Sequence, residues 1–408
     1  MTSPIPSPPD TLTRPAEKGS TRLAVPSSLL FAQGAGALGL AAGGTAGPLL
    51  IQQLTGSDTL VALPLGLLVV GSGVSAPLVT ALMRRSARAV GLLLSYSVAA
   101  AGAWLVVLSA TSHGLLALLA GSLLLGAGNA AVMLGRYVAA DGAPRSRVGA
   151  AVSLAMTAVT VGAVVGPALL GPAGSVATSL GLPSLTGLYL LAGIVFPLAA
   201  AVTLVLNRAT PRAPAPVETA GAPARSAHRF LPLVVLGTAN LTMVVVMAVM
   251  PADLHTMGWP LATVGVLVAA HIGAMFGPSP VSGWVRDRAG STLTALVGSG
   301  LLVCAAVLSA ASAQTGGAVV SVTGLVLLGV GWNFQLIGGT AMLIERTPAA
   351  SRSRAEGLGE LTMGLAAASG TLGLVGPMIE LGGMTLVCVV VCGLTVVVAA
   401  PLVRELRR

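Results

Sequence analysis

The chain has 408 residues, of which 55% are apolar and only 8% are charged. Soluble domains carry roughly 25% charged residues, so this composition excludes a soluble protein and indicates an integral membrane protein. The apolar runs are continuous and do not alternate with polar residues, which excludes a transmembrane β-barrel. In a soluble protein, a formal net charge of +9 would favour binding to nucleic acid. Here the basic residues lie between apolar runs, so we expect no nucleic-acid partner and interpret them as determinants of membrane orientation.

ATP-driven pumping and enzymatic activity are not expected. Lys18 is the only lysine, it lies in the N-terminal tail, and no glycine-rich phosphate-binding loop precedes it. The three cysteines, Cys304, Cys388 and Cys392, lie inside apolar runs, where buried thiols are expected instead of a zinc cluster or a disulfide framework. We therefore expect a protein that is not an enzyme and has no resident cofactor.

Twelve apolar runs are predicted to form transmembrane helices, because each is close to the about 20 residues that a helix needs to cross a bilayer. They lie near 26–52, 59–83, 89–110, 114–138, 149–170 and 184–206, and then near 229–252, 260–284, 291–312, 318–344, 355–378 and 381–403. A disordered tail is expected at 1–25, a polar linker at 207–228 and a short tail at 404–408. The sequence predicts an all-α membrane protein with two six-helix bundles, 26–206 and 229–403.

The basic residues support this topology. When both termini are placed in the cytoplasm, the cytoplasmic tails, loops and linker contain every lysine and arginine of the chain, and the outer loops contain none. Such a one-sided distribution is a strong positive-inside signal. We expect a monomeric, multi-pass protein of the inner or plasma membrane, surrounded by lipid, with both termini cytoplasmic.

The two halves are related by an offset of 203 positions. This offset pairs Arg85 with Arg288, Pro48 with Pro251, and the Gly-Ala-Gly segment at 126–128 with the Gly-Val-Gly segment at 329–331. Matches at one offset indicate a duplication. Paired parallel halves joined by a polar linker are expected of a transporter whose site lies between the bundles. They argue against a membrane scaffold or sensor, which does not require two matching halves.

Residues 283–290 read G-W-V-R-D-R-A-G, and this segment resembles the G-x-x-x-D-R-x-G loop signature of the major facilitator superfamily. In the first half the counterpart reads T-A-L-M-R-R-S-A-R at 80–88, so that Arg84 replaces the acid of the family and both glycines are absent. Arg136-Tyr137, with Asp141 and Arg147 after the fourth run, is also similar to this superfamily. The resemblance implies the major facilitator fold of twelve helices and secondary active transport by alternating access.

The resemblance also implies a cytoplasmic gate. Its expected members are Arg84, Arg85, Arg88, Gly283, Asp287, Arg288, Glu356 and Glu360. In the superfamily the loop acid engages the start of the eleventh helix, so an arginine at position 84 leaves a cationic face that needs a partner. We expect Arg84, alone or with Arg85, to pair with Glu356 or Glu360 and to hold the cytoplasmic side closed.

The fifth run contains a Gly162-x-x-x-Gly166-Pro167 pattern. This pattern resembles the signature of drug/proton antiporters, and it is equally typical of two helices that pack closely through small residues. Many drug/cation antiporters have an acid in the first transmembrane helix. Residues 29–50 contain none, and Gln33 is the most polar residue there, which argues against multidrug export.

Two methionines and a histidine–methionine pair mark the seventh and eighth runs. Met243 and Met247 are four residues apart, as are His271 and Met275, and thioether and imidazole groups suit the soft ion Cu(I). The pattern M-x-x-x-M followed by H-x-x-x-M resembles the CcoA-type copper-uptake branch of the superfamily. That resemblance implies that these four residues bind copper as the transported substrate.

Counting along the two helices at about 1.5 Å per residue puts Met247 and Met243 ~9 and ~15 Å below the outer face, and His271 and Met275 ~16 and ~22 Å below it. Methionine on a helix is otherwise mainly a packing residue, whereas a histidine in a bilayer is usually functional. Copper uptake through these residues is the function we expect. The alternative is proton-coupled efflux of a small organic compound or drug.

Overall fold

The structure, a computed structural model, describes residues 25–56, 60, 63–112, 114–141, 143–209, 230–256, 258–259 and 261–407. Within these residues every regular element is helical. The predicted tail at 1–25 and the linker at 207–228 lie almost wholly outside the described residues; Asn207 to Ala209 belong to the last helix of the first half.

The first half consists of six membrane-crossing helices, two of which are divided. The elements are α1 (Ser27–Ala41), η1 (Ala42–Ala46), α2 (Gly47–Thr55), α3 (Leu63–Arg85), α4 (Arg88–Ser112), α5 (Leu115–Asp141), α6 (Val148–Ala168), α7 (Leu170–Ser179) and α8 (Gly187–Ala209). The π-helical segment η1 joins α1 to α2 in the first crossing, and α7 extends the fifth. Short 3₁₀ turns precede α6 and α8 at Arg145–Arg147 and Ser184–Thr186.

The second half is also built of six crossings, but its helices run through two glycine breaks. The elements are α9 (Leu231–Thr256), α10 (Leu261–Phe276), α11 (Ser279–Thr315), α12 (Ala318–Arg346), a 3₁₀ turn at Ala349–Ser351, α13 (Arg352–Ala368), η6 (Ser369–Leu374) and α14 (Val375–Leu406). Gly290 has φ 86° and ψ 163° inside α11, a conformation open to glycine and strained for other residues. Gly383, with φ 62°, breaks α14 in the same way.

The breaks explain how the helices make twelve crossings. Nine helical stretches of the described residues are long and apolar enough to span a membrane, and one of them, Leu267–Thr315, has 49 residues. At about 1.5 Å per residue this stretch is too long for one crossing, so the break at Gly290 turns it into two. With α9 and α13 the total is twelve, which confirms the predicted all-α fold of two six-helix bundles.

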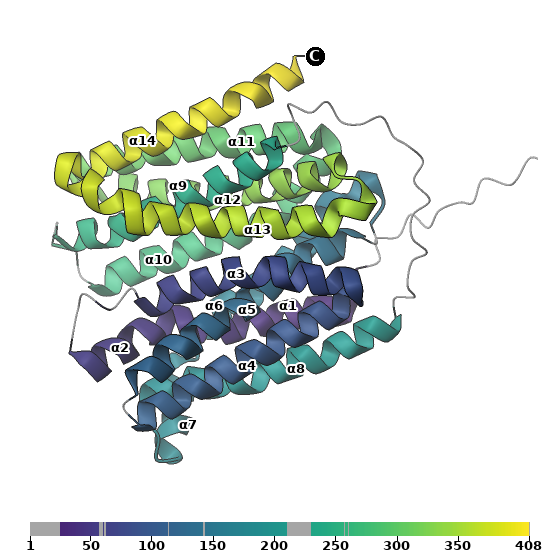
Figure 1. The fold of residues 1–408 in the computed structure, drawn as a ribbon. Coiled ribbons are helices and arrows are strands. Elements are labelled where there is room, and N and C mark those ends of the chain that lie inside the picture. The colour runs from purple at the N-terminus through teal and green to yellow at the C-terminus, as the bar shows by residue number, and fades with distance from the viewer. Residues whose placement is uncertain are drawn as a thin grey trace, which may run out of the picture.

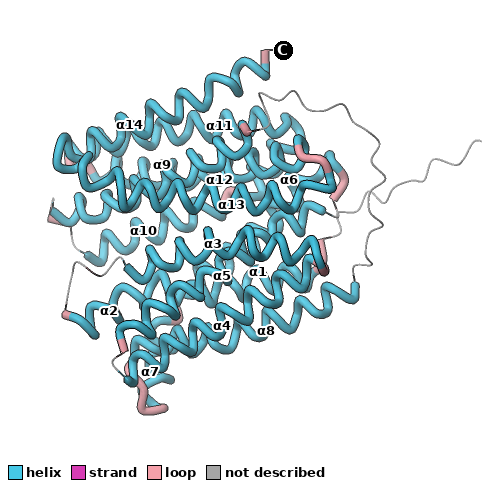
Figure 2. Tube along the Cα trace, viewed as in Figure 1, coloured by secondary structure: helices cyan, strands magenta, loops and turns pink. Residues whose placement is uncertain are grey.

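The two bundles lie side by side. Figure 1 shows α1 to α8, coloured purple to teal, below α9 to α14, coloured green to yellow, and Figure 2 shows the helices linked by short turns at both ends. The halves meet where α3 packs along α13 and α6 along α11. One apolar core continues across this boundary, since Leu236, Trp332 and Met363 of the second half belong to the same buried cluster as the core of the first.

Glycines set the closest helix contacts within the first bundle. A methyl group at Gly162 of α6 would lie 2.1 Å from the carbonyl oxygen of Gly34 in α1, and one at Gly166 would lie 2.2 Å from the Cβ atom of Ala41. The glycine pattern of the fifth crossing is therefore required for packing of α6 on α1, which is the second of the two interpretations of that motif.

Candidate functional site

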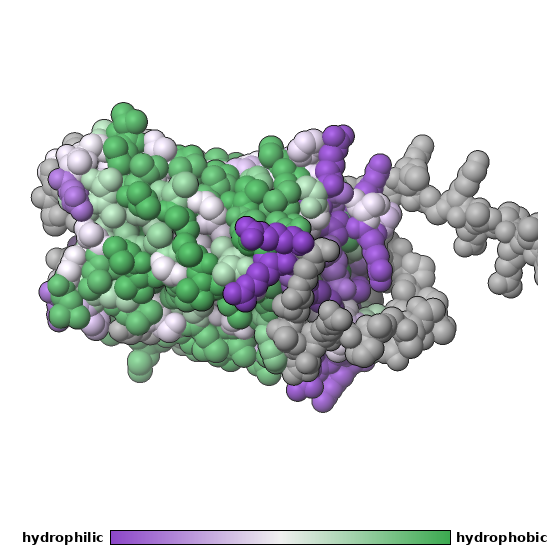
Figure 3. All heavy atoms as spheres, turned by 90° about the horizontal axis from the view of Figure 1, so that it is seen from above, coloured by the Kyte–Doolittle hydropathy of each residue, from purple (hydrophilic) through white to green (hydrophobic). Residues whose placement is uncertain are grey.

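Charged residues gather at one end of the molecule, which we call the arginine-rich end. Figure 3 shows hydrophilic residues concentrated there, while the middle of the surface is apolar. The end is formed by the helix termini and turns that carry Arg84, Arg85, Arg88, Arg145, Arg147, Arg286, Arg288, Arg346, Arg352, Arg354, Arg404 and Arg407. Hydrogen bonds and ion pairs that join described residues of the two halves lie at or near this end.

The first of these connections is formed by Arg88 at the start of α4. Its guanidinium group contacts both oxygens of Glu356 in α13, and its Nε atom lies 2.6 Å from Asp141 at the end of α5. The Glu356 side chain is completely buried, whereas that of Arg88 is 23% exposed. Arg88 therefore ties the first bundle to α13 through a partly buried ion pair, which we call the Arg88 latch.

The second connection uses a carboxylate and the start of a helix. Asp287, three residues before the Gly290 break in α11, accepts hydrogen bonds from the backbone N–H groups of Gly149 and Ala150 at 2.7 and 2.8 Å. These are unpaired donors in the first turn of α6, and a negative charge is stabilised at a helix N-terminus. Arg286 holds Asp287 at 2.7 Å and also donates to the carbonyl oxygen of Arg145. We call this contact the Asp287 cap.

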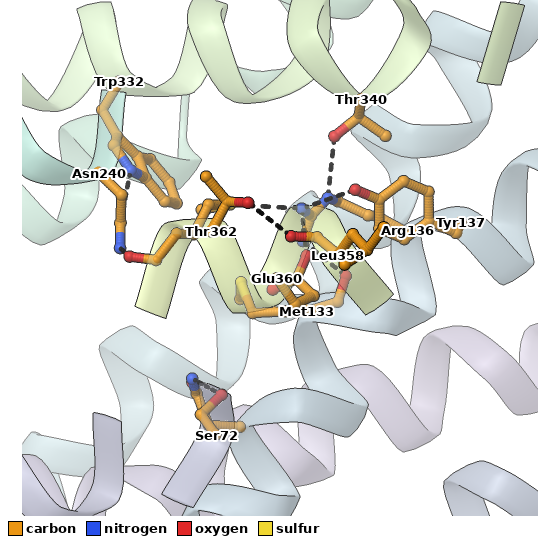
Figure 4. Close-up of polar contacts among 12 residues, drawn as sticks. Ser72, Met133, Arg136, Tyr137, Asn240, Trp332, Thr340, Leu358, Glu360 and Thr362 are labelled. Atoms are coloured by element: carbon orange, nitrogen blue, oxygen red, sulfur yellow. Dashed lines mark hydrogen bonds and ion pairs between the residues drawn. The ribbon is translucent and has the colours of Figure 1, made fainter. Parts of the chain in front are cut away.

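A third connection lies deeper between the bundles. Arg136 of α5 is completely buried, and its Nη2 atom lies 2.5 Å from Glu360 of α13. Figure 4 shows Arg136 and Glu360 pointing toward each other, with Thr340 and Tyr137 around the guanidinium group. The carbonyl oxygen of Met133 accepts a further hydrogen bond. The pair is thus shielded from solvent, and the two charges compensate each other.

The prediction that Arg84 pairs with Glu356 or Glu360 is wrong. Glu356 is bound by Arg88 and Glu360 by Arg136, while Arg84 and Arg85 lie at the end of α3, with Arg84 exposed. The physical reason is position: Arg88 begins α4 beside Asp141, so its side chain reaches α13, whereas Arg84 precedes the turn. From the sequence, Arg136 and Asp141 are recognised only as residues similar to the superfamily. Their ion-pair partners, Glu360 and Arg88, become apparent only in the structure.

The other expected gate residues lie on the second-half side of the same end. A methyl group at Gly283 would lie 2.6 Å from the carbonyl oxygen of Gly149, so the two halves touch there through backbone. Arg288 places its guanidinium group 4.7 Å from the ring centre of Trp284. Arg288 therefore packs within its own half.

The expected copper ligands are divided between separate packing environments. α10 packs mainly against α12, and His271, which is 1% exposed, has its Nδ1 atom 2.8 Å from the carbonyl oxygen of Leu325 in α12. Met247 packs on an apolar cluster inside the second half, while Met243 and Met275 pack on the cluster shared by both halves. In the part of the chain that the structure describes, no group of three or more His, Cys, Asp or Glu side chains is placed to hold a metal ion.

Two paired helical halves that meet through small residues and are latched at one end define a membrane transporter of the two-bundle class. The chain matches the Major Facilitator Superfamily over residues 29–371. It is 34% identical over 382 residues to YdeG of Bacillus subtilis, described as an uncharacterized MFS-type transporter, with 90% of this chain and 88% of that protein covered. The protein therefore belongs to the major facilitator superfamily.

One more distant sequence relative and two solved structures of similar fold are also found. The riboflavin transporter RfnT of Brucella anthropi is 27% identical over 327 residues, which cover 78% of this chain and 79% of that protein. The human organic anion transporter MFSD10 superposes with a TM-score of 0.73 at 16% identity, with 93% of this chain and 98% of the other covered. FucP in its outward conformation gives a TM-score of 0.66 at 15% identity over 93% and 99% of the chains.

Proposed function

We propose that this protein is a proton-coupled secondary transporter of a small organic solute, held here in the state that is closed at the cytoplasmic side. The observation that carries the proposal is that three different connections, the Arg88 latch, the Asp287 cap and the Arg136–Glu360 pair, join the halves at one end. A transporter that alternates between two states must break all three to open that end. The positive-inside rule assigns this arginine-rich end to the cytoplasm.

Glu360 is the residue we propose for proton coupling. Separating the bundles would leave the buried charges of Arg136 and Glu360 without each other, which costs several kcal/mol. A proton on Glu360 removes its charge before the bundles part. Arg136 then keeps two partners on its own helix, the Met133 carbonyl group and the Tyr137 hydroxyl group. Protonation therefore favours opening of the cytoplasmic end.

The organic character of the solute is supported by the relatives. The named substrate among the sequence relatives is riboflavin, and the structure with the TM-score of 0.73 belongs to an organic anion transporter. The second bundle also carries an amide and an indole group near its boundary with the first, since Trp332 donates a hydrogen bond to Asn240 at 3.2 Å. Such groups suit a hydrogen-bonding organic molecule.

The test is transport in liposomes that contain the purified protein. Radiolabelled riboflavin, nicotinamide and nicotinate are each offered with an imposed pH gradient, with and without a protonophore, and empty liposomes are the control. We expect the gradient to drive at least one of these solutes and the protonophore to abolish the accumulation. Movement of ⁶⁴Cu without movement of any organic solute would overturn the proposal.

Copper is the second candidate, and one observation favours it. A carbonyl oxygen can only accept, so Nδ1 of His271 carries the proton and donates it to Leu325. The Nε2 atom is then a buried lone pair with no partner among the described residues. Metal-binding histidines use this arrangement, in which one ring nitrogen donates to a carbonyl group and the other binds the metal.

The copper candidate has its own test. Accumulation of ⁶⁴Cu is measured in cells that express the protein, the His271→Ala variant or the Met243→Leu variant, which conserves the volume of the methionine. The copper proposal requires accumulation by the parent and loss in both variants at equal membrane levels. Equal copper contents in cells with and without the parent would exclude it.

A further inference from the structure

The asparagines inside the bundles differ in how far their hydrogen-bonding groups are used. Asn333 of α12 is completely buried, and its amide donates to the Met275 carbonyl oxygen and the Ser279 hydroxyl group while accepting from Ser282. Two other asparagines, Asn129 of α5 and Asn240 of α9, are only partly buried. Their side chains are therefore not fully enclosed by protein.

Asn129 uses one of its hydrogen-bonding groups within the protein. Its Nδ2 atom donates to the Ser72 hydroxyl group of α3 at 2.9 Å, and no described residue contacts its Oδ1 atom by a hydrogen bond. Gly126 fixes the position of this pair, because a methyl group there would lie 2.4 Å from both the Leu68 carbonyl oxygen and the Ser72 nitrogen. The backbones of α3 and α5 therefore touch one turn before Asn129.

Asn240 makes two hydrogen bonds within the second half. Its Nδ2 atom donates to the Met363 carbonyl oxygen of α13 at 2.8 Å, and its Oδ1 atom accepts from the Trp332 indole group at 3.2 Å. Trp332 packs edge-on against Phe276, with ring centres 5.6 Å apart. One N–H group and one oxygen lone pair of Asn240 remain unused.

The two amides lie on either side of a close helix crossing. Ser72 precedes Gly73 and Met363 precedes Gly364, and a methyl group at Gly364 would lie 3.1 Å from the Cα atom of Gly73. The backbones of α3 and α13 are thus in contact between the partner of Asn129 and the partner of Asn240. Figure 4 shows Ser72 on one side of the α13 segment that carries Thr362 and Asn240 with Trp332 on the other.

The charges next to the two asparagines compensate each other. Arg136 reaches this region through a 3.8 Å contact of its Nη2 atom with the Met363 sulfur atom, and the charge of Arg136 is compensated by Glu360. Arg136 and Glu360 are themselves buried and have no net charge between them, so a charged solute would bring a charge that no described residue beside the two asparagines compensates. An uncharged solute brings no such charge.

We propose that Asn129 and Asn240 form a recognition subsite for an uncharged organic solute that carries a planar amide, lactam or imide edge. Each asparagine keeps at least one N–H group and one oxygen lone pair without a partner among the described residues, and an amide edge carries the complementary acceptor and donor. One solute edge bonds to each half, so that the solute bridges the two bundles. This inference rests on the proposed transport of an organic solute and names its chemical class.

The experiment measures binding of two matched pairs of probes by equilibrium dialysis with the purified full-length protein. The pairs are riboflavin with riboflavin 5′-phosphate, and nicotinamide with nicotinate, so each pair shares a ring and differs in charge. The variants are Asn129→Ala, Asn129→Asp and Asn240→Ala. Ser97→Ala is the matched control, because Ser97 is exposed on α4 and bonds only within its own helix.

We expect the parent to bind the uncharged member of at least one pair at least tenfold more tightly than the charged member. Each asparagine variant weakens this binding about tenfold, and Ser97→Ala leaves it unchanged. Thermal unfolding of every variant reports whether it is folded, and the preference of the parent alone tests the inference if a variant fails to fold.

The inference is overturned if the parent binds neither uncharged probe, if it prefers the charged members, or if folded asparagine variants bind like the parent. Binding and transport of a charged organic probe leave the proposed function intact while overturning the subsite. Transport of copper with no organic probe bound overturns both.

Discussion

Arg88 at the start of α4 binds Glu356 in α13, just after the turn that carries Arg84 in place of an acid. In the second half the acid is present, and Asp287 caps α6 through two backbone N–H groups. The two halves match each other at an offset of 203 positions, yet the contacts that they contribute at this end differ in chemistry. One connection is a pair of side-chain charges, and the other is a charge on a helix terminus.

Charge reversal tests the Arg88 latch. Arg88→Glu brings a third carboxylate next to Asp141 and Glu356, so we expect transport to be lost. The double variant Arg88→Glu with Glu356→Arg restores opposite charges and should recover part of the rate. The measurement is initial transport rate at equal protein levels. Arg84→Glu is the control and should transport like the parent, because Arg84 is exposed at the end of α3; a loss as large as that of Arg88→Glu would contradict this assignment.

Removal of the Asp287 cap should open the arginine-rich end more often. Loss of a cap costs about 0.5–2 kcal/mol, so Asp287→Ala is expected to raise the open population about two- to thirtyfold. The measurement is maleimide labelling of Ser153→Cys, a position 6% exposed beside Gly283, in a background that lacks the three native cysteines. Arg288→Ala should leave the labelling unchanged, since Arg288 packs on Trp284 in its own half.

Two glycine substitutions should have opposite consequences. A methyl group at Gly283 has its closest contacts with Gly149 and Ser153 of the other half, so Gly283→Val is expected to keep both bundles folded and to prevent closure of the arginine-rich end. A side chain at Gly162 would overlap the backbone of α1 inside one bundle, so Gly162→Val is expected to lower the unfolding temperature sharply. Thermal unfolding separates the two variants. A folded, active Gly162→Val protein would show that the α1–α6 contact is not needed.

Neutralising Glu360 should uncouple transport from protons. Glu360→Gln keeps the shape of the side chain but removes its charge, so no proton can bind or leave at this position. We expect concentration by a pH gradient to be lost, while exchange of labelled for unlabelled solute continues. Counterflow and gradient-driven uptake are measured on the same liposomes. Gradient-driven accumulation at the parental level would assign proton coupling to another residue.

The sequence predicts the crossings well because hydrophobic length is a property of local composition. The run at 89–110 corresponds to α4 at Arg88–Ser112, and the run at 114–138 to α5 at Leu115–Asp141. The eighth and ninth runs, at 260–284 and 291–312, are less well predicted, because helical structure continues into the segment between them. The backbone turns only at Gly290, inside α11.

The site residues are harder to predict, because counting residues along a helix gives the depth of a side chain in the membrane but not the neighbouring helix that it faces. The sequence predicts that an arginine of the loop after α3 meets an acid near the start of α13. Only the path of the turn after α3 shows that this arginine is Arg88 and not Arg84. Counting likewise gives His271 a depth, whereas the packing of α10 on α12 decides that its ring contacts Leu325. Pairing of Arg136 with Glu360 depends on how the two bundles meet, and no local pattern encodes that.

The start of α6 is capped from outside its own bundle. Arg147, at the N-cap position, makes no side-chain cap, so Gly149 and Ala150 obtain their acceptor from Asp287 only while the two halves are together. A separation of the halves would therefore remove the acceptor of both amides, and we expect the first turn of α6 to loosen each time that this happens. Deuterium exchange at these two amides would count the openings directly, without any label or substrate.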